Sequence, residues 1–340
     1  MTDKITNKAA WQVAPGKQLE FGTTDVPVPG ANEVLVRNSA IAINPLDWLL
    51  QDYALLPWLT YPAILGSDIA GTIVAVGSGV QRLKIGDRVL GQAVGTTVNE
   101  KAQGAFQQYT IVPEHLTAPI PDRMEFSEAA VLPLGLGTAA SGLYGEKMLA
   151  LAPPSHSPVV KDEVVLIWGG SSSVGVNAIQ LAVASGYRVF TTASASNAEM
   201  LKSLGASAVF DHASPSIVDE VLEAMQGIRL AGTLHATGDM ATSFAVVGRS
   251  EGSRLVAATL PASADLPEGV EARHIAGTSL KDDAVGPMIY RDFLPQALES
   301  GSFVSAPPAK IAGHGLEALQ VALQILKAGV SATKVVVTLD

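Results

Sequence analysis

The stretch from Val164 to Ser194 constrains the fold most strongly. An apolar run that ends at Trp168 leads into a small-residue turn, after which apolar runs cover residues 176–184 and 188–192. A strand, a glycine-rich turn, a helix and a second strand form the unit that holds a dinucleotide. Small side chains in the turn let a pyrophosphate approach the backbone amides and the helix N-terminus. The turn consists of Gly169, Gly170, Ser171, Ser172, Ser173, Val174 and Gly175.

Beyond this stretch, helical and strand-like segments continue to alternate. Helical patterns cover residues 197–204 and 217–225. Strand-like runs cover residues 209–211, 231–236, 254–258 and 274–280. Such alternation is typical of a parallel sheet with helices on both faces, so this part of the chain is predicted to be an α/β domain.

The chain before residue 133 has a different pattern, in which short strands are separated by glycine and proline. These strands cover residues 33–38, 71–77, 86–91 and 107–112. The pattern predicts a compact, mostly β domain with long loops. A helix capped by Ser127 is expected to continue to about residue 148. The chain closes with an amphipathic helix over 315–327 and a strand over 334–339.

The composition limits the classes of function. The 340 residues are enough for two domains, 48% of them are apolar, and none is cysteine. A chain without cysteine has no disulfide, thiolate nucleophile or cysteine-ligated metal, which fits a cytoplasmic enzyme. No apolar run approaches the roughly 18 residues of a membrane span, and the first four residues do not resemble a signal peptide. The net charge of −10 is spread along the chain, so no nucleic-acid partner is expected.

Several sequence blocks occur in the order found in one known family. They are Gly66-Ser67-Asp68-Ile69-Ala70-Gly71-Thr72-Ile73, residues 76–80, Gly86-Asp87-Arg88-Val89 and residues 329–337. Together with the glycine-rich turn, they resemble the medium-chain dehydrogenase/reductase superfamily over nearly the whole chain. The resemblance implies an α/β protein with a Rossmann doubly wound parallel sheet and a GroES-like, mostly β domain.

The resemblance also implies how the domains are arranged along the chain. A GroES-like catalytic domain is expected over residues 1–130 and a Rossmann NADP-binding domain over residues 131–300. Residues 301–340 are expected to return to the catalytic domain. In this family the active site lies in the cleft between the two domains.

Motif details narrow the resemblance to one branch. Zinc-dependent members carry Gly-His-Glu where this chain has Gly66-Ser67-Asp68, and they need a cysteine ligand, so no metal is expected here. Residues 44–48, 132–135 and 194–197, with Gly205-Ala206, resemble the fungal trans-acting enoyl reductases. Those proteins reduce carrier-bound polyketide intermediates beside a highly reducing synthase, and zinc-free quinone reductases are their nearest neighbours. Their Asn-Pro-x-Asp-Trp motif is often followed by lysine, whereas Leu49 follows it here.

The end of the second strand indicates which nicotinamide cofactor is bound. In NAD-specific sites, an acidic residue about 20 residues after the glycine turn bonds the ribose 2′-hydroxyl. Residues 191–197 consist of threonine, alanine, serine and asparagine, and the first acid is Glu199. Hydroxyls and an amide accept a 2′-phosphate that a carboxylate would repel, so this segment favours NADP(H). The alternative, which can hold at the same time, is that its serines cap the helix that begins near Asn197.

The resemblance assigns cofactor contacts to individual residues. Ser194, Ser196 and Asn197 would hold the 2′-phosphate, with Lys202 as an additional candidate, and His212 takes the place of an adenosine-contacting tyrosine. The complete predicted cofactor set is Asn44, Pro45, Leu46, Asp47, Gly169, Gly170, Ser171, Ser172, Ser173, Val174, Gly175, Ser194, Ala195, Ser196, Asn197, His212 and Thr259.

A further segment resembles the part of the family that lies beside the substrate and the nicotinamide. Reduction of an α,β-unsaturated thioester sends hydride to the β-carbon and leaves an enolate oxygen that needs a hydrogen-bond donor. Candidate donors are Tyr53 and Thr138, with a backbone amide or water as alternatives, and Tyr53 can equally be a core or lid aromatic. The glycines and the proline of the segment also suit a domain hinge. The segment is Pro133, Leu134, Gly135, Leu136, Gly137, Thr138, Ala139 and Ala140.

Three functions remain open from the sequence. The first is an NADPH-dependent reductase of activated C=C bonds, acting as a trans-acting enoyl reductase with a polyketide synthase. The second is a soluble quinone or enone oxidoreductase that acts on free small molecules. The third is the same fold recruited to a non-redox role, such as binding or cyclising an intermediate, because no lysine follows Trp48. A monomer and a homodimer are both compatible with the sequence.

Overall fold

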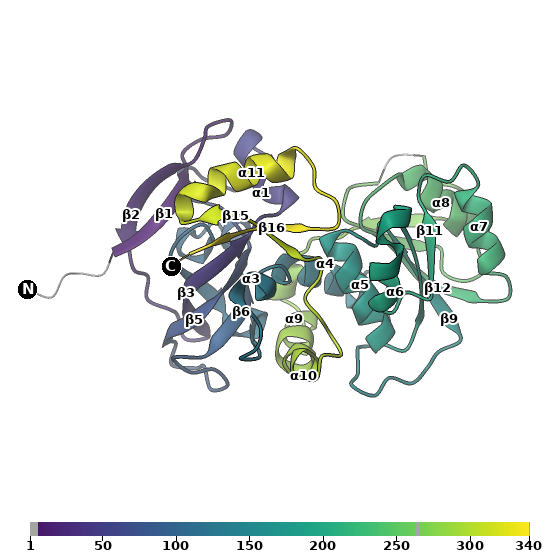
Figure 1. Cartoon of the computed structure of the whole chain (residues 1–340), viewed down its shortest axis with the longest axis horizontal. Helices are drawn as coiled ribbons and strands as arrows, with labels where there is room; N and C mark the ends of the chain where they lie inside the picture. The colour runs from purple at the N-terminus through teal and green to yellow at the C-terminus, as the bar shows by residue number, and fades with distance from the viewer. Residues whose placement is uncertain (1–5, 263–264, 340) are drawn as a thin grey trace, which may run out of the picture. The chain divides into compact units, whose positions relative to one another are not determined.

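The chain is described by a computed structural model over residues 6–262 and 265–339. It divides into two compact units (Figure 1). The first, called the β unit, comprises the residues up to Leu134, the segment Gly286–Gly301, and the residues from Pro308 onward. The second, called the Rossmann unit, comprises Gly135–Val285 and Ser302–Pro307. After leaving the β unit, the chain therefore returns to it twice.

The Rossmann unit contains a six-stranded parallel sheet in the order β11-β10-β9-β12-β13-β14. The strand order reverses between β9 and β12, and open α/β sheets bind ligands at such a switch point, beyond the carboxyl ends of the strands. The predicted doubly wound α/β fold is confirmed. The strands are β9 (Glu163–Trp168), β10 (Arg188–Ala193), β11 (Ala208–Asp211), β12 (Arg229–His235), β13 (Leu255–Ala258) and β14 (Glu271–His274).

Helices cover this sheet because its strands carry apolar side chains on both faces. Val165 and Leu166 are neighbours in β9, so they point to opposite faces, and both are fully buried. α5 packs on β9 and β10, while α8 contacts β12 and β13. The helices of this unit are α4 (Pro133–Tyr144), which starts in the β unit, α5 (Ser173–Ala184), α6 (Ala198–Ser203), α7 (Ile217–Ala224) and α8 (Met240–Arg249), with the 3₁₀ helices η3 (Ala195–Asn197) and η4 (Ser279–Lys281).

The β unit contains a seven-stranded sheet in the order β15-β16-β3-β5-β6-β8, with β7 paired to β3, and a small sheet in the order β2-β1-β4. β16 pairs antiparallel with β3, so the end of the chain completes the sheet that its beginning starts. The strands are β1 (Thr6–Gln12), β2 (Glu20–Asp25), β3 (Glu33–Ala42), β4 (Ala63–Ile64), β5 (Asp68–Val76), β6 (Arg88–Gln92), β7 (Tyr109–Pro113), β8 (Thr117–Pro119), β15 (Ala309–His314) and β16 (Lys334–Thr338).

Short helices surround the sheets of the β unit. The core that they help to close includes Ile69, Phe106 and Leu323, all of which are buried. The α-helices are α1 (Pro45–Asp52), α2 (Gly95–Val98), α3 (Phe126–Ala129), α9 (Val285–Pro287), α10 (Leu294–Ser300) and α11 (Leu319–Lys327). The other helices are the π-helix η5 (Met288–Phe293) and the 3₁₀ helices η1 (Lys101–Gln103), η2 (Glu114–Leu116) and η6 (Leu316–Ala318).

Two expected elements differ from the structure. The helix predicted from Ser127 is broken into α3 and α4, and α4 starts at Pro133, a residue suited to the first position of a helix because it has no N–H to pair. The strand predicted over 274–280 ends at His274. Gly277 then packs so closely on α4 that a Cβ on it would lie 2.3 Å from Thr138 Oγ1.

Gly66 combines a left-handed backbone with close packing, and this combination generates a test of the fold. Its φ is +90°, and a Cβ on it would lie 2.3 Å from the Phe106 ring. Gly86 has a similar φ of +95° but no atom within 4 Å of its Cβ position. We expect Gly66→Ala to lower the free energy of unfolding by about 2–4 kcal/mol, through strain plus overpacking, and Gly86→Ala by about 1 kcal/mol. Urea unfolding followed by tryptophan fluorescence measures both, and equal losses would contradict the packing argument.

Candidate functional site

The turn after β9 is shaped by the absence of side chains. Gly169 has a φ of +83°, and a Cβ on Gly170 would lie 2.0 Å from Thr191 Oγ1. A Cβ on Gly175 would lie 2.4 Å from the carbonyl oxygen of Gly169. The turn therefore packs directly against β10 and the first turn of α5, with no room for larger residues.

Hydroxyl groups hold this turn in place. Ser172 Oγ accepts a hydrogen bond from the Gly175 N–H at 3.0 Å and donates one to the Gly169 carbonyl at 2.8 Å. Thr192 Oγ1 accepts from the Gly169 N–H at 2.9 Å. Ser172 thus caps α5, whose first N–H groups have no partner inside the helix. Ser173 and Val174 supply two of these groups, so the residues present fit a pyrophosphate.

Two more residues lie at the carboxyl edge of the sheet. Thr259, which was predicted, follows β13, and its Oγ1 donates to the Ala236 carbonyl at 2.8 Å. His235, which was not predicted, ends β12 beside the switch point and is 1% exposed. Neither ring nitrogen has a hydrogen-bond partner among the described residues, and burial lowers the pKa of His235. His235 stands alone at the end of an apolar run and belongs to no recognisable motif, so the sequence did not identify it as a candidate site residue.

The loop after β10 contains the predicted 2′-phosphate residues. Ser194 Oγ lies 3.1 Å from His212 Nε2. Neither Ser194 nor Asn197 makes a side-chain capping bond, so capping does not account for these two residues. Asn197 Nδ2 is buried without a hydrogen-bond partner among the described residues. Lys202 is held by Glu199 at 2.9 Å.

In the β unit, Asn44 belongs to a buried charged cluster. Its backbone N–H donates to Asp47 Oδ2 at 2.7 Å, and its side-chain Nδ2 donates to Asp68 Oδ2 at 2.9 Å. Lys334 Nζ donates to Asn44 Oδ1 and lies 2.8 Å from Asp68 Oδ2. The second oxygen of Asp68 accepts from the Leu134 N–H at 2.6 Å. Asp68 and Lys334 were not among the predicted site residues, because only the folded chain brings them to Asn44.

The charges of this cluster do not balance when all groups are ionised. Asp47, Asp68 and Lys334 are 1%, 0% and 3% exposed. Burial raises the pKa of Asp47 to about 7, helped by the charge of Asp68 and opposed by the Asn44 N–H and by Lys334. Asp47 therefore takes up a proton more readily than an exposed aspartate does.

The predicted substrate segment is mostly buried within α4. The hydroxyl of Tyr290 donates to the carbonyl of Pro133, the first residue of the segment, at 2.6 Å. The N–H of Leu134, the next residue, donates to Asp68. Leu134 and Thr138 are half-buried, whereas the other residues from Pro133 to Ala140 are buried. Four residues apart, these two share one face of the helix. Tyr53, at the end of α1, is 54% exposed, so it is not a core aromatic.

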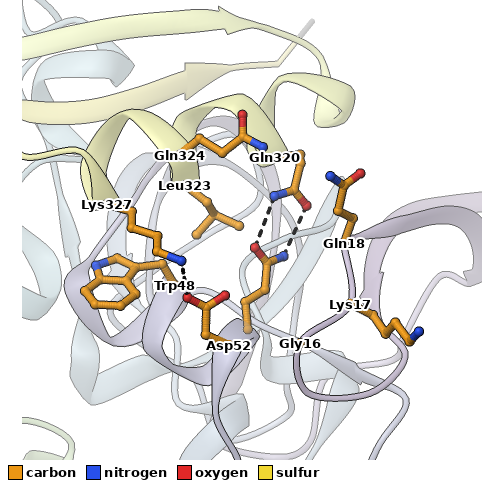
Figure 2. A pocket seen from close by; sticks show the side chains of 10 residues that line it. Gly16, Lys17, Gln18, Trp48, Asp52, Gln320, Leu323, Gln324 and Lys327 are labelled. Carbon is orange, nitrogen blue, oxygen red and sulfur yellow. Dashed lines mark hydrogen bonds and ion pairs between the residues drawn. The ribbon is translucent and has the colours of Figure 1, made fainter.

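The second half of α1 is fastened to α11. Gln51 and Gln320 form a reciprocal pair of amide hydrogen bonds, each 3.1 Å long. The two bonds are the pair of dashed lines that end on Gln320 in Figure 2. Lys327 pairs with Asp52 and lies 5.8 Å from the centre of the Trp48 ring. The cavity beside them, of about 170 Å³, is bordered by α1, α11 and residues 16–18. These contacts hold α1, whose N-cap is Asn44 and whose first turn carries Asp47.

The described residues form neither a cluster of metal ligands nor a membrane-spanning helix. No three histidine, aspartate or glutamate side chains in the described part of the chain are grouped as metal ligands would be. None of the helices formed by the described residues is long and apolar enough to cross a membrane.

Comparison with known proteins identifies the family of this chain. The model of the alcohol dehydrogenase GroES-like domain matches residues 30–122. The dehydrogenase azaJ of Aspergillus niger is 46% identical, over 98% of this chain and 99% of its own. The trans-enoyl reductase himH of Aspergillus japonicus is 40% identical, over 99% of this chain and 98% of its own. A solved alcohol dehydrogenase superfamily protein from Novosphingobium aromaticivorans has a TM-score of 0.81 at 26% identity, covering 98% of this chain and 100% of that one.

The fold, the glycine-rich turn and these relatives define a nicotinamide-dependent oxidoreductase. The chain belongs to the medium-chain dehydrogenase/reductase superfamily, as the sequence predicted. Within that superfamily, its relatives include fungal proteins named as dehydrogenases and trans-enoyl reductases.

The pKa of Asp47 predicts how stability depends on pH. The raised pKa means that the folded state keeps a proton that the unfolded chain, with a pKa near 3.8, releases. The wild type therefore loses stability as the pH rises from about 4 to 7, while Asp47→Asn keeps an acceptor for the Asn44 N–H and does not titrate. We expect the variant to gain about 2–4 kcal/mol relative to wild type between pH 4.5 and pH 7.5.

Urea unfolding at these two pH values measures the difference. The exposed Asp122→Asn is the matched control and should follow the wild type. A constant difference between wild type and Asp47→Asn would show that Asp47 is not protonated in the folded protein.

Proposed function

We propose that this protein is an NADPH-dependent, metal-free reductase of activated C=C bonds that acts as a trans-acting enoyl reductase on a carrier-bound, polyketide-type thioester. The observation that carries the cofactor assignment is the loop after β10. There Ser194 bonds His212, Asn197 has an unpaired amide donor, and no carboxylate occurs before Glu199. The assignment of the acceptor is supported by the 40% identity to a trans-enoyl reductase over nearly the full length of both chains.

The chain's own residues would bind, orient and shield the reactants. When bound, the reduced nicotinamide supplies a hydride, which would go to the β-carbon of the acceptor. The turn from Gly169 to Gly175 would hold the pyrophosphate. The candidates for donating to the enolate oxygen are the hydroxyl groups of Tyr53, an exposed residue, and of Thr138, a half-buried one. A donor at such an oxygen contributes about 10²–10³ in rate in enzymes where it has been removed.

The absence of a metal is supported by the chemistry of the cluster in the β unit. Zinc sites use thiolate, imidazole and carboxylate ligands, and this chain has no cysteine and carries Ser67 in the motif. Both oxygens of Asp68 already accept hydrogen bonds, from Leu134 and Asn44, and one lies beside Lys334. Hydrogen-bond donors, rather than a Lewis acid, would therefore stabilise the enolate.

The identity of the acceptor is tested by following NADPH oxidation by the purified protein. We expect oxidation with crotonyl pantetheine thioester, faster turnover when the acyl chain is on the carrier domain of a synthase, and no effect of EDTA. Oxidation with quinones but not with thioesters would favour the quinone reductase alternative instead. Tight NADPH binding without oxidation by any acceptor would contradict both and favour a non-redox role.

A further inference from the structure

His212 and Ser194 meet at the edge of the sheet because β10 and β11 are parallel neighbours. Ala193 is paired in register with Asp211, so the residues that follow the two strands lie at the same edge. The backbone N–H of His212 donates to the Ala193 carbonyl at 3.1 Å. The ring Nε2 of His212 lies 3.1 Å from Ser194 Oγ. His212 is exposed and Ser194 half-exposed, so a ligand at this edge reaches both side chains.

The charges around this pair point to a role for the histidine. Between residues 188 and 212, all of which the structure describes, the other cations are Arg188 and Lys202. Arg188 pairs with Asp162 at the opposite end of β10, and Lys202 pairs with Glu199, each at 2.9 Å. Protonation of His212 is therefore the way in which this segment can place an uncompensated positive charge beside Ser194.

Asn197 gives independent evidence that a hydrogen-bond acceptor is missing from the loop after β10. Its Nδ2 is buried and has no partner among the described residues, which is uncommon for a buried amide. Its backbone N–H donates to the Ser194 carbonyl at 2.9 Å, so the two residues belong to one compact turn. A hydroxyl, an amide donor and an imidazole around one turn match the oxygens of a phosphate.

We propose that His212 is the residue that selects NADP(H) over NAD(H), and that it does so as an imidazolium whose charge makes the selection dependent on pH. The inference rests on the proposed NADP(H) preference and identifies the group whose protonation changes that preference. A protonated ring has two N–H donors. One would bond Ser194 Oγ and the other an oxygen of the 2′-phosphate.

The direction of the pH dependence follows from the two ionisations. An imidazole gains its charge below about pH 6.5, and a phosphate monoester loses its second charge below about pH 6. Both charges therefore coexist near pH 6.5, and the cation is lost by pH 8.5. The neighbouring charged groups are Asp211, Glu199, Lys202 and, on α7, Glu220. Carboxylates and ammonium groups change charge outside this range, so the histidine is the group that varies.

The experiment measures dissociation constants of NADPH and NADH by nicotinamide fluorescence at pH 6.5 and 8.5, in buffers without phosphate. Wild type should bind NADPH about tenfold more tightly at pH 6.5 than at pH 8.5, as one charge-assisted hydrogen bond allows. NADH, which lacks the phosphate, should change less than about twofold. His212→Gln should lose the NADPH pH dependence, while His156→Gln, on an exposed loop, should keep it.

A second readout does not depend on the nicotinamide. Saturation with 2′-AMP should raise the midpoint of the His212 ring titration observed by NMR, and 5′-AMP should leave it unchanged. The His212 signal is assigned by its loss in His212→Gln. An unchanged midpoint with 2′-AMP bound would overturn the proposal, as would His212→Gln with a wild-type pH dependence.

Failure of the proposal is distinguishable from failure of the NADP(H) assignment. The double variant Ser194→Asp, Ser196→Asp should weaken NADPH at both pH values and leave NADH nearly unchanged. One outcome would overturn only the role of His212. In that outcome, wild type prefers NADPH equally at both pH values, and the double variant loses this preference. A wild type that binds NADH as tightly as NADPH at both pH values would overturn the NADP(H) preference as well.

Discussion

The buried ion pair between Lys334 and Asp68 connects parts of the β unit that are far apart in the sequence. Lys334 begins β16, Asp68 begins β5, and both bond Asn44 beside α1. Asp68 also bonds the Leu134 N–H at the start of α4. Removing one member of such a pair costs about 3–5 kcal/mol, because the other charge remains buried. The closing strand, α1 and the start of α4 therefore depend on one interaction. The pKa of Asp47, which lies beside this pair, is raised by burial.

The two units carry different chemistry. In the β unit, buried charges fix the backbone, and the oxygens of Asp68 are already used by Asn44, Lys334 and Leu134. In the Rossmann unit, the carboxyl edge of the sheet carries glycines, hydroxyls and an exposed histidine, His212. We infer that reducing power comes from a nicotinamide cofactor that the second set holds, while the first set holds together the backbone of the β unit.

The sequence predicted those features whose contacts lie between residues close together in the chain. The turn from Gly169 to Gly175 was predictable because a side chain on any of its glycines would clash with atoms nearby in the sequence or on a neighbouring segment. The break at Pro133 and the early end of β14 depend on packing that periodicity does not show. Lys334 and Asn44 are 290 residues apart in the chain, so no spacing rule joins them. Asn44 and Asp47 entered the predicted site only through the resemblance to a family.

The central claim, a metal-free transfer of hydride from a nicotinamide to a C=C bond, is tested most directly by isotope transfer. The protein, treated with EDTA, is incubated with crotonyl pantetheine thioester and NADPH that carries deuterium at both C4 positions, and the product is analysed by mass spectrometry and NMR. The account predicts a saturated thioester with one deuterium at the β-carbon. Recovery of unreduced thioester under conditions where the cofactor is bound, or reduction that requires added zinc, would contradict it.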